Sequence, residues 1–151
     1  MTDLTPAGRR VVDRARLLAE QFGTPLFVYS RRAIESRYRA VETALEGVAH
    51  RICYAVKANG NGAILRLLAG LGAGADIVSG GEMLAALRAG FSPERIVFAG
   101  VGKTDEELAL GLERGIGEFN AESEQEIQRL NRIVEDLLRV THPQPLRKTP
   151  E

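Results

Sequence analysis

Lys57 closes a short apolar stretch, residues 52–57, and has the chemistry to act as a nucleophile. The stretch has the length and residue types of a buried β-strand. Two interpretations are open at this point: a solvated lysine where a strand leaves the core, or an amine held in a partly dry pocket at the mouth of a barrel. Such a pocket favours a neutral lysine amine, which can form a Schiff base with an aldehyde. The surrounding elements must decide between the two.

Strand and helix signals alternate along the chain on both sides of this stretch. Apolar residues at helical spacing predict helices, and short apolar runs bounded by glycine or proline predict strands. The predicted strands are 26–29, 52–57, 75–79, 96–99 and 116–120, and the predicted helices include about 7–22, 31–46, 63–71 and 124–139.

Three tetrads of the pattern S/T-x-x-E follow strand signals, at 79–82, 104–107 and 123–126. In a capping box the Ser or Thr accepts a hydrogen bond from the amide three residues on, and the Glu reaches back toward the start of the helix. Three such matches indicate a series of βα units. We therefore assign Ser79 and Glu82 mainly to capping.

The last four strand signals recur about every 20–23 residues, which leaves room for one short helix per unit. Such connections are normally right-handed crossovers onto a parallel sheet. An open doubly wound sheet and a (β/α)8 barrel both fit, but the short constant period and the lack of G-x-G-x-x-G after the first strand favour the barrel. The predicted fold class is α/β, about half of a TIM-type (β/α)8 barrel. The predicted domains are a helix and strand leading into the barrel (1–30), the partial barrel (31–139) and a disordered tail (140–151).

Side chains alternate along a strand, so Cys53, Ala55 and Lys57 should share the barrel's interior face. The bulkier Tyr54 and Val56 should pack under the helices. Lys57 would then lie at the carboxyl end of its strand, where barrel active sites lie.

Composition narrows the class of protein. The chain has 151 residues and a formal net charge of zero, which gives no electrostatic footprint for nucleic acid or an acidic membrane. No apolar run approaches the roughly 20 residues of a membrane span, and the start of the chain does not resemble a secretory signal. One cysteine, Cys53, is consistent with a reducing cytoplasm. No His/Cys spacing predicts a metal site.

Five segments of the chain stand out as motifs: G-T-P-L-F-V-Y (23–29), Y-A-V-K-A-N (54–59), G-A-D-I-V-S-G-G-E (74–82), F-A-G-V-G-K-T (98–104) and F-N-A-E-S (119–123). In this order they resemble segments of the barrel-type pyridoxal-phosphate (PLP) decarboxylases that act on diaminopimelate, ornithine and arginine. The segment F-A-G-V-G-K-T is the one that best separates the diaminopimelate enzymes from the ornithine enzymes.

The resemblance implies an alanine-racemase-like PLP barrel in which Lys57 carries the cofactor. The expected reaction is a carboxy-lyase step of lysine biosynthesis, meso-diaminopimelate to L-lysine and CO2. Asp76 matches a family position close to the lysine and the cofactor, and a carboxylate satisfied by loop amides is the alternative. For Lys103 a solvated lysine is favoured over a direct cofactor role. The family is homodimeric.

The sequence also departs from the family, whose members are far longer. It lacks the histidine that stacks on PLP, the glycine-rich phosphate loop, the acidic partner of the pyridine nitrogen and the second, β-rich domain. Cys53 cannot be the catalytic cysteine of that domain. We therefore expect a truncated or split enzyme with little or no activity alone, and an exposed half-barrel edge that could self-associate. The alternatives are an ornithine- or arginine-decarboxylase-type fragment, a single-domain PLP-homeostasis protein, or a non-enzymatic module that pairs with a complete decarboxylase.

Overall fold

The computed structural model describes residues 6–141. By packing, the chain divides into two units, Met1–Arg37 and Tyr38–Glu151. The division falls within one helix, whereas the sequence placed a boundary just before that helix.

The first unit contains α1 (Pro6–Phe22) and the beginning of α2 (Arg31–Ala44). Gly23, with φ of 80°, ends α1, as its sequence predicts. The Ser30 hydroxyl accepts a hydrogen bond from the amide of Ala33 at 3.3 Å and caps α2. The strand predicted at 26–29 is not present, because no described segment pairs with it and its side chains are exposed. Apolar character alone cannot make a strand without a hydrogen-bonding partner.

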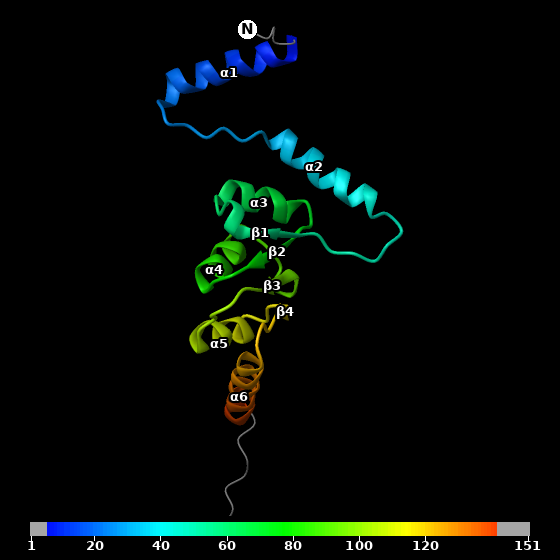
Figure 1. Ribbon diagram of the computed structural model, residues 1–151, viewed down its shortest axis with the longest axis vertical. Helices are drawn as coiled ribbons and strands as arrows, with labels where there is room; N and C mark the ends of the chain where they lie inside the picture. Colours follow the sequence, from blue (N-terminus) through cyan, green and yellow to red (C-terminus); the bar gives the residue numbers. More distant parts are fainter. Residues whose placement is uncertain (1–5, 142–151) are drawn as a thin grey trace, which may run out of the picture. The chain divides into compact units, whose positions relative to one another are not determined.

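The second unit is built on four parallel strands that pair in chain order (Figure 1). Helices alternate with the strands, and α3 packs against α4, α4 against α5, and α5 against α6. The strands are β1 (Cys53–Ala55), β2 (Gly74–Ile77), β3 (Ile96–Phe98) and β4 (Glu118–Phe119). The helices are α3 (Gly62–Gly70), α4 (Gly80–Ala89), α5 (Asp105–Glu113) and α6 (Glu124–Thr141), with 3₁₀ turns η1 (Val56–Ala58) and η2 (Pro93–Arg95).

The two faces of this sheet are unlike. One face carries Ala75, Ile77, Ile96 and Phe98, all fully buried. The opposite face carries residues in register across the strands that are only half-buried, among them Cys53, Ala55, Asp76 and Val97. A parallel sheet with one packed face and one open face is the wall of a βα barrel, of which this is about half. The predicted fold class is confirmed.

All three predicted helix caps form, and the one at Thr104 is a complete capping box. Thr104 and Glu107 exchange both hydrogen bonds of the box. Ser79 and Ser123 accept from the amides of Glu82 and Glu126, while each glutamate bonds the amide of the residue before its cap. These boxes set where α4, α5 and α6 begin, and hence the lengths of the loops after β2, β3 and β4. The C-terminal tail predicted at 140–151 begins inside α6, and residues 142–151 lie outside the described part.

Candidate active site

Lys57 lies one turn beyond the end of β1. The strand stops at Ala55, and the next three residues form η1, closed by a hydrogen bond from the Asn59 amide to the Val56 carbonyl at 3.1 Å. The expectation that Lys57 ends the strand is therefore wrong by one turn. Val56 is buried and anchors η1 in the core, which leaves Lys57 exposed. Among residues 6–141, the Lys57 ammonium makes no hydrogen bond or ion pair.

Asp76 lies on β2, directly beside Ala55 in the register of the sheet. Its side chain is on the open face, the face expected to line a barrel. The Oδ1 atom is buried and has no hydrogen-bond partner among the described residues. Loop amides therefore do not satisfy this atom. Leaving a buried polar atom unpaired costs about 1–3 kcal/mol, so the position is suited to a donor that the described residues do not supply.

An unpaired amine on η1, the turn after β1, and an unpaired carboxylate oxygen on the neighbouring strand β2 thus lie toward the carboxyl end of the sheet. The amine can attach to an aldehyde, and the carboxylate oxygen can accept a hydrogen bond from a group bound there. Small Ala55 leaves space on the same face. These residues fit a lysine-bound aldehyde cofactor.

The amino end of the same face is closed by a different set of contacts. Arg51 forms an ion pair with Glu118 and donates to the carbonyl of Glu94 at 3.0 Å. A Cβ added at Gly74 would come within 2.5 Å of the Arg95 carbonyl oxygen, so this end of the face is crowded. The amino end of the described face therefore has no room for a ligand.

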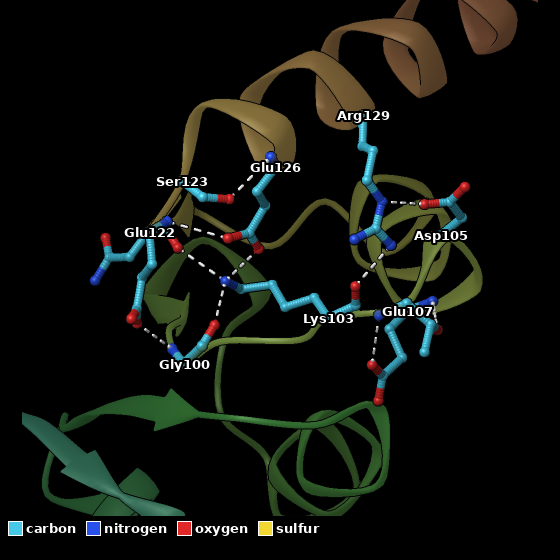
Figure 2. A network of polar contacts seen from close by, with 10 residues as sticks. Gly100, Lys103, Asp105, Glu107, Glu122, Ser123, Glu126 and Arg129 are labelled. Atoms are coloured by element: carbon cyan, nitrogen blue, oxygen red, sulfur yellow. Dashed lines mark hydrogen bonds and ion pairs between the residues drawn. The ribbon is translucent and has the colours of Figure 1, made fainter.

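Lys103 has a role that neither sequence interpretation anticipated. Figure 2 shows its side chain reaching to Gly100 and to Glu126 at the start of α6. The side chain is 1% exposed, so it is not solvated. Its Nζ donates to the carbonyls of Gly100 and Asn120 at 2.7 and 2.8 Å and to Glu126 Oε1 at 2.6 Å. The three donors of the ammonium are all used within the protein, which leaves none for a cofactor.

Cys53, the one cysteine of the chain, is a free, half-buried thiol on the open face. In the part of the chain that is described, no three His, Cys, Asp or Glu side chains gather as a metal site, and no helix is long and apolar enough to cross a bilayer.

The Arg51–Glu118 and Lys103–Glu126 pairs join residues far apart in the sequence. Sequence reasoning missed both ion pairs. The capping pattern of a βα unit can be recognised from neighbouring residues, but the distant residue that pairs with Arg51 or Lys103 cannot.

A parallel βα wall with an exposed lysine and an unpartnered carboxylate toward its carboxyl end fits one class: barrel proteins that hold an aldehyde cofactor on a lysine. Comparison with known families makes this specific. The family model described as pyridoxal-dependent decarboxylase, pyridoxal binding domain, matches residues 31–149. The chain belongs to this family, whose cofactor is pyridoxal phosphate.

Individual relatives agree with the family. Diaminopimelate decarboxylase of Pseudomonas aeruginosa is 50% identical over 134 residues, which cover 89% of this chain and 32% of the relative. The enzyme of the same name from Aquifex aeolicus is 54% identical over 116 residues, 77% of this chain and 27% of the relative. A crystal structure of diaminopimelate decarboxylase from Helicobacter pylori complexed with L-lysine superimposes with a TM-score of 0.78 at 41% identity, over 82% of this chain and 31% of that one. The chain spans about a third of the length of these relatives.

Proposed function

We propose that this chain is the cofactor-anchoring part of a diaminopimelate decarboxylase, with Lys57 as the residue that attaches PLP. The observation that carries the proposal is that an exposed amine without a partner, Lys57, follows β1 while the unpartnered buried Oδ1 of Asp76 lies on the adjacent strand β2. Relatives named diaminopimelate decarboxylase support the assignment over the ornithine and arginine types.

Each residue has a separate task. PLP, when bound, accepts the electron pair left behind as a carboxylate departs from the substrate as CO2. Lys57 supplies the amine that attaches the cofactor, and its place on η1, outside the buried strand, lets the side chain reach into the open face. Asp76 offers Oδ1 as an acceptor to the bound group. The proposed substrate is meso-diaminopimelate and the product L-lysine.

The proposal includes a limit on activity. About two thirds of each relative has no counterpart among the residues of this chain. We expect residues 1–151 alone to bind PLP without turning over diaminopimelate, because tuning the cofactor and orienting the substrate take groups from several sides. Release of CO2 from diaminopimelate by the purified chain, above that of free PLP, would contradict this limit.

The anchor is tested by trapping. PLP is added, the product is reduced with borohydride, and the modified peptides are mapped by mass spectrometry; the lysines are Lys57, Lys103 and Lys148. We expect a cofactor absorbance band and a modified Lys57, both lost in Lys57→Ala, with Lys103 unmodified in both proteins. Any adduct at Lys148 or the N-terminal amine should be equal in the two and serves as the internal control. Equal spectra for the two proteins would rule out Lys57 as the anchor.

Two further properties belong to the proposal. β1 and β4 are the end strands of the described sheet, each with one edge that no described strand covers. Such edges favour association, so we expect self-association through the half-barrel edge. Sedimentation velocity over a concentration series checks this, and a monomer throughout would contradict it.

A cytoplasmic location is proposed because the free thiol of Cys53 suits a reducing compartment.

A further inference from the structure

The loop that follows β3 is held from both sides by its neighbours. Gly100 donates its amide to Glu122 Oε1 at 2.9 Å, and its carbonyl accepts from Lys103. Gly100 has φ of 84°, and a Cβ there would lie 3.2 Å from the side chain of Val78 in the loop after β2. The loops after β2, β3 and β4 therefore meet at this residue.

Lys103 is the link between the second and third of these loops. Its ammonium bonds one carbonyl after β3, that of Gly100, and one after β4, that of Asn120. It also lies 5.6 Å from the centroid of the Phe98 ring, which belongs to the fully buried face of the sheet. The ammonium is thus on the helix side of the wall, away from the open face that carries Asp76.

Glu126 completes the link from α6. Its Oε1 accepts from Lys103, and its Oε2 accepts from the amide of Glu122 at 3.0 Å (Figure 2). Burial acts to raise the pKa of Glu126, but the hydrogen bonds from Lys103 and from the Glu122 amide outweigh it and hold the pKa below its usual value. The carboxylate is therefore charged at neutral pH.

Glu107, the capping glutamate of α5, also links two successive βα units. Glu107 caps α5 and also accepts from the amide of Gly80, at the start of α4, at 2.7 Å. Successive βα units are thus joined at their carboxyl ends by glutamates that cap one helix and reach toward the preceding unit. Because parallel strands place all these ends at one edge, this is also the edge that carries Lys57.

A buried ion pair contributes little net stability compared with a well-packed apolar pair, since both charges must be desolvated. What it contributes here is geometry, because three hydrogen bonds fix two loops relative to each other. We propose that Lys103, through Glu126, is a positioning residue that holds the loops after β3 and β4 in place at the rim of the cofactor site. The part that concerns the cofactor rests on the proposed function; the part that concerns the loops does not.

The test replaces the ion pair by an apolar pair, Lys103→Met with Glu126→Leu, in the full 151-residue chain. This keeps the volume and removes the bonds to the Gly100 and Asn120 carbonyls. The matched control is Arg31→Met with Glu35→Leu, which replaces an exposed ion pair of 2.8 Å by the same two apolar residues. Backbone amide hydrogen exchange and PLP affinity, from a titration of the cofactor band, are measured for all three proteins.

In the Lys103/Glu126 double variant we expect amide exchange about tenfold faster in residues 99–104 and 120–123, with the amides of β1 and β2 unchanged. We also expect PLP affinity to be about tenfold weaker, by analogy with residues that do not touch a bound metal but orient the side chains that do. The control should match the wild type. Unchanged exchange in both loops would overturn the proposal, and faster exchange with unchanged PLP affinity would overturn its cofactor part.

A second variant guards against loss of folding. Glu126→Gln keeps the shape and an acceptor oxygen, and we expect exchange about threefold faster in the same two loops; wild-type rates in this variant would also overturn the proposal. If the wild type takes up no PLP at Lys57, the proposed function fails, while the exchange measurements still decide whether Lys103 holds the loops.

Discussion

Lys57 and Lys103 both follow a strand of the same parallel sheet, at the same edge, yet the chain uses them in opposite ways. Lys57 is exposed and has no partner among the described residues, whereas Lys103 is buried with three. An amine that is to react with a ligand must be free of hydrogen bonds to the protein. A buried ammonium, in contrast, needs a protein acceptor for each of its three N–H groups. Exposure and hydrogen bonding therefore separate the two lysines more clearly than their sequence contexts do.

The carboxylates show the same contrast. Glu126 is buried with both oxygens bonded, and Asp76 is half-buried with a buried oxygen that lacks a donor. One carboxylate has both oxygens bonded within the folded chain, and the other has a buried oxygen to which no described residue donates. Four substitutions test this contrast through the free energy of unfolding.

The largest effect is expected for Lys103→Met. The change leaves the Glu126 carboxylate buried without its cation, and removal of one partner from a buried pair typically costs about 3–5 kcal/mol. Urea unfolding followed by circular dichroism measures the loss. Restoration toward wild-type stability by adding Glu126→Leu is the matched control, and a loss below about 1 kcal/mol in the single variant would show that the pair is not as buried as described.

A smaller loss, about 1–2 kcal/mol at pH 7, is expected for Glu126→Gln, because the Lys103 ammonium loses its counter-charge but keeps the Gly100 and Asn120 carbonyls and a glutamine oxygen as acceptors. The pKa of Glu126 is lower in the folded chain than its ordinary value of 4.5, so its charge stabilises the fold above pH 4.5. That stabilisation is lost as the pH falls through the folded pKa. Unfolding measured at several pH values should show the gap between wild type and variant closing below pH 4.5; a gap independent of pH would contradict the charge.

Asp76→Ala should lower the free energy of unfolding by less than about 1 kcal/mol, or raise it. The substitution removes a buried oxygen that accepts no hydrogen bond, so no donor in the described residues loses its partner. PLP affinity should fall about tenfold in the same variant, since a hydrogen bond to a charged group contributes about 1.5–3 kcal/mol. Thermal unfolding and a PLP titration give the two values. A large loss of stability would mean that Asp76 has a structural partner after all.

The smallest effect on stability is expected for Lys57→Ala, within about 0.5 kcal/mol, as for other exposed positions that make no special contact. Thermal unfolding without PLP checks it. The comparison with Lys103→Met then spans the two extremes for a lysine at one sheet edge. Destabilisation of similar size in both variants would remove the distinction between an anchor and a structural lysine.

Much of the fold could be predicted from local patterns. The four strands of the sheet, the starts of α4, α5 and α6 and the half-barrel class follow from short apolar runs and capping tetrads, and all are confirmed. The strand at 26–29 was wrong, because a strand exists only with a partner, and pairing is not encoded in the run itself. The end of β1 was placed too late, because an apolar run does not distinguish Val56 in a strand from Val56 anchoring a 3₁₀ turn.

Of the candidate site, Lys57 and Asp76 could be picked out because their motifs carry the family resemblance, although their roles remain proposals. The Lys103–Glu126 pair could not, since its members are 23 residues apart and each has a sufficient local explanation. A lysine before a cap is usually solvated, and a glutamate at the third helical position usually only caps. Their meeting depends on β3 and β4 lying side by side.

The sequence by itself determined the alternation of strands and helices, the caps that start the helices and the lysine with a claim to chemistry. These depend on contacts within a few residues, which spacing and residue type specify. Only the tertiary structure decided which lysine is free and which carboxylate lacks a partner. Burial and long-range hydrogen bonds are properties of the packed sheet edge, where Gly100, Lys103, Asn120 and Glu126 from two βα units come within bonding distance.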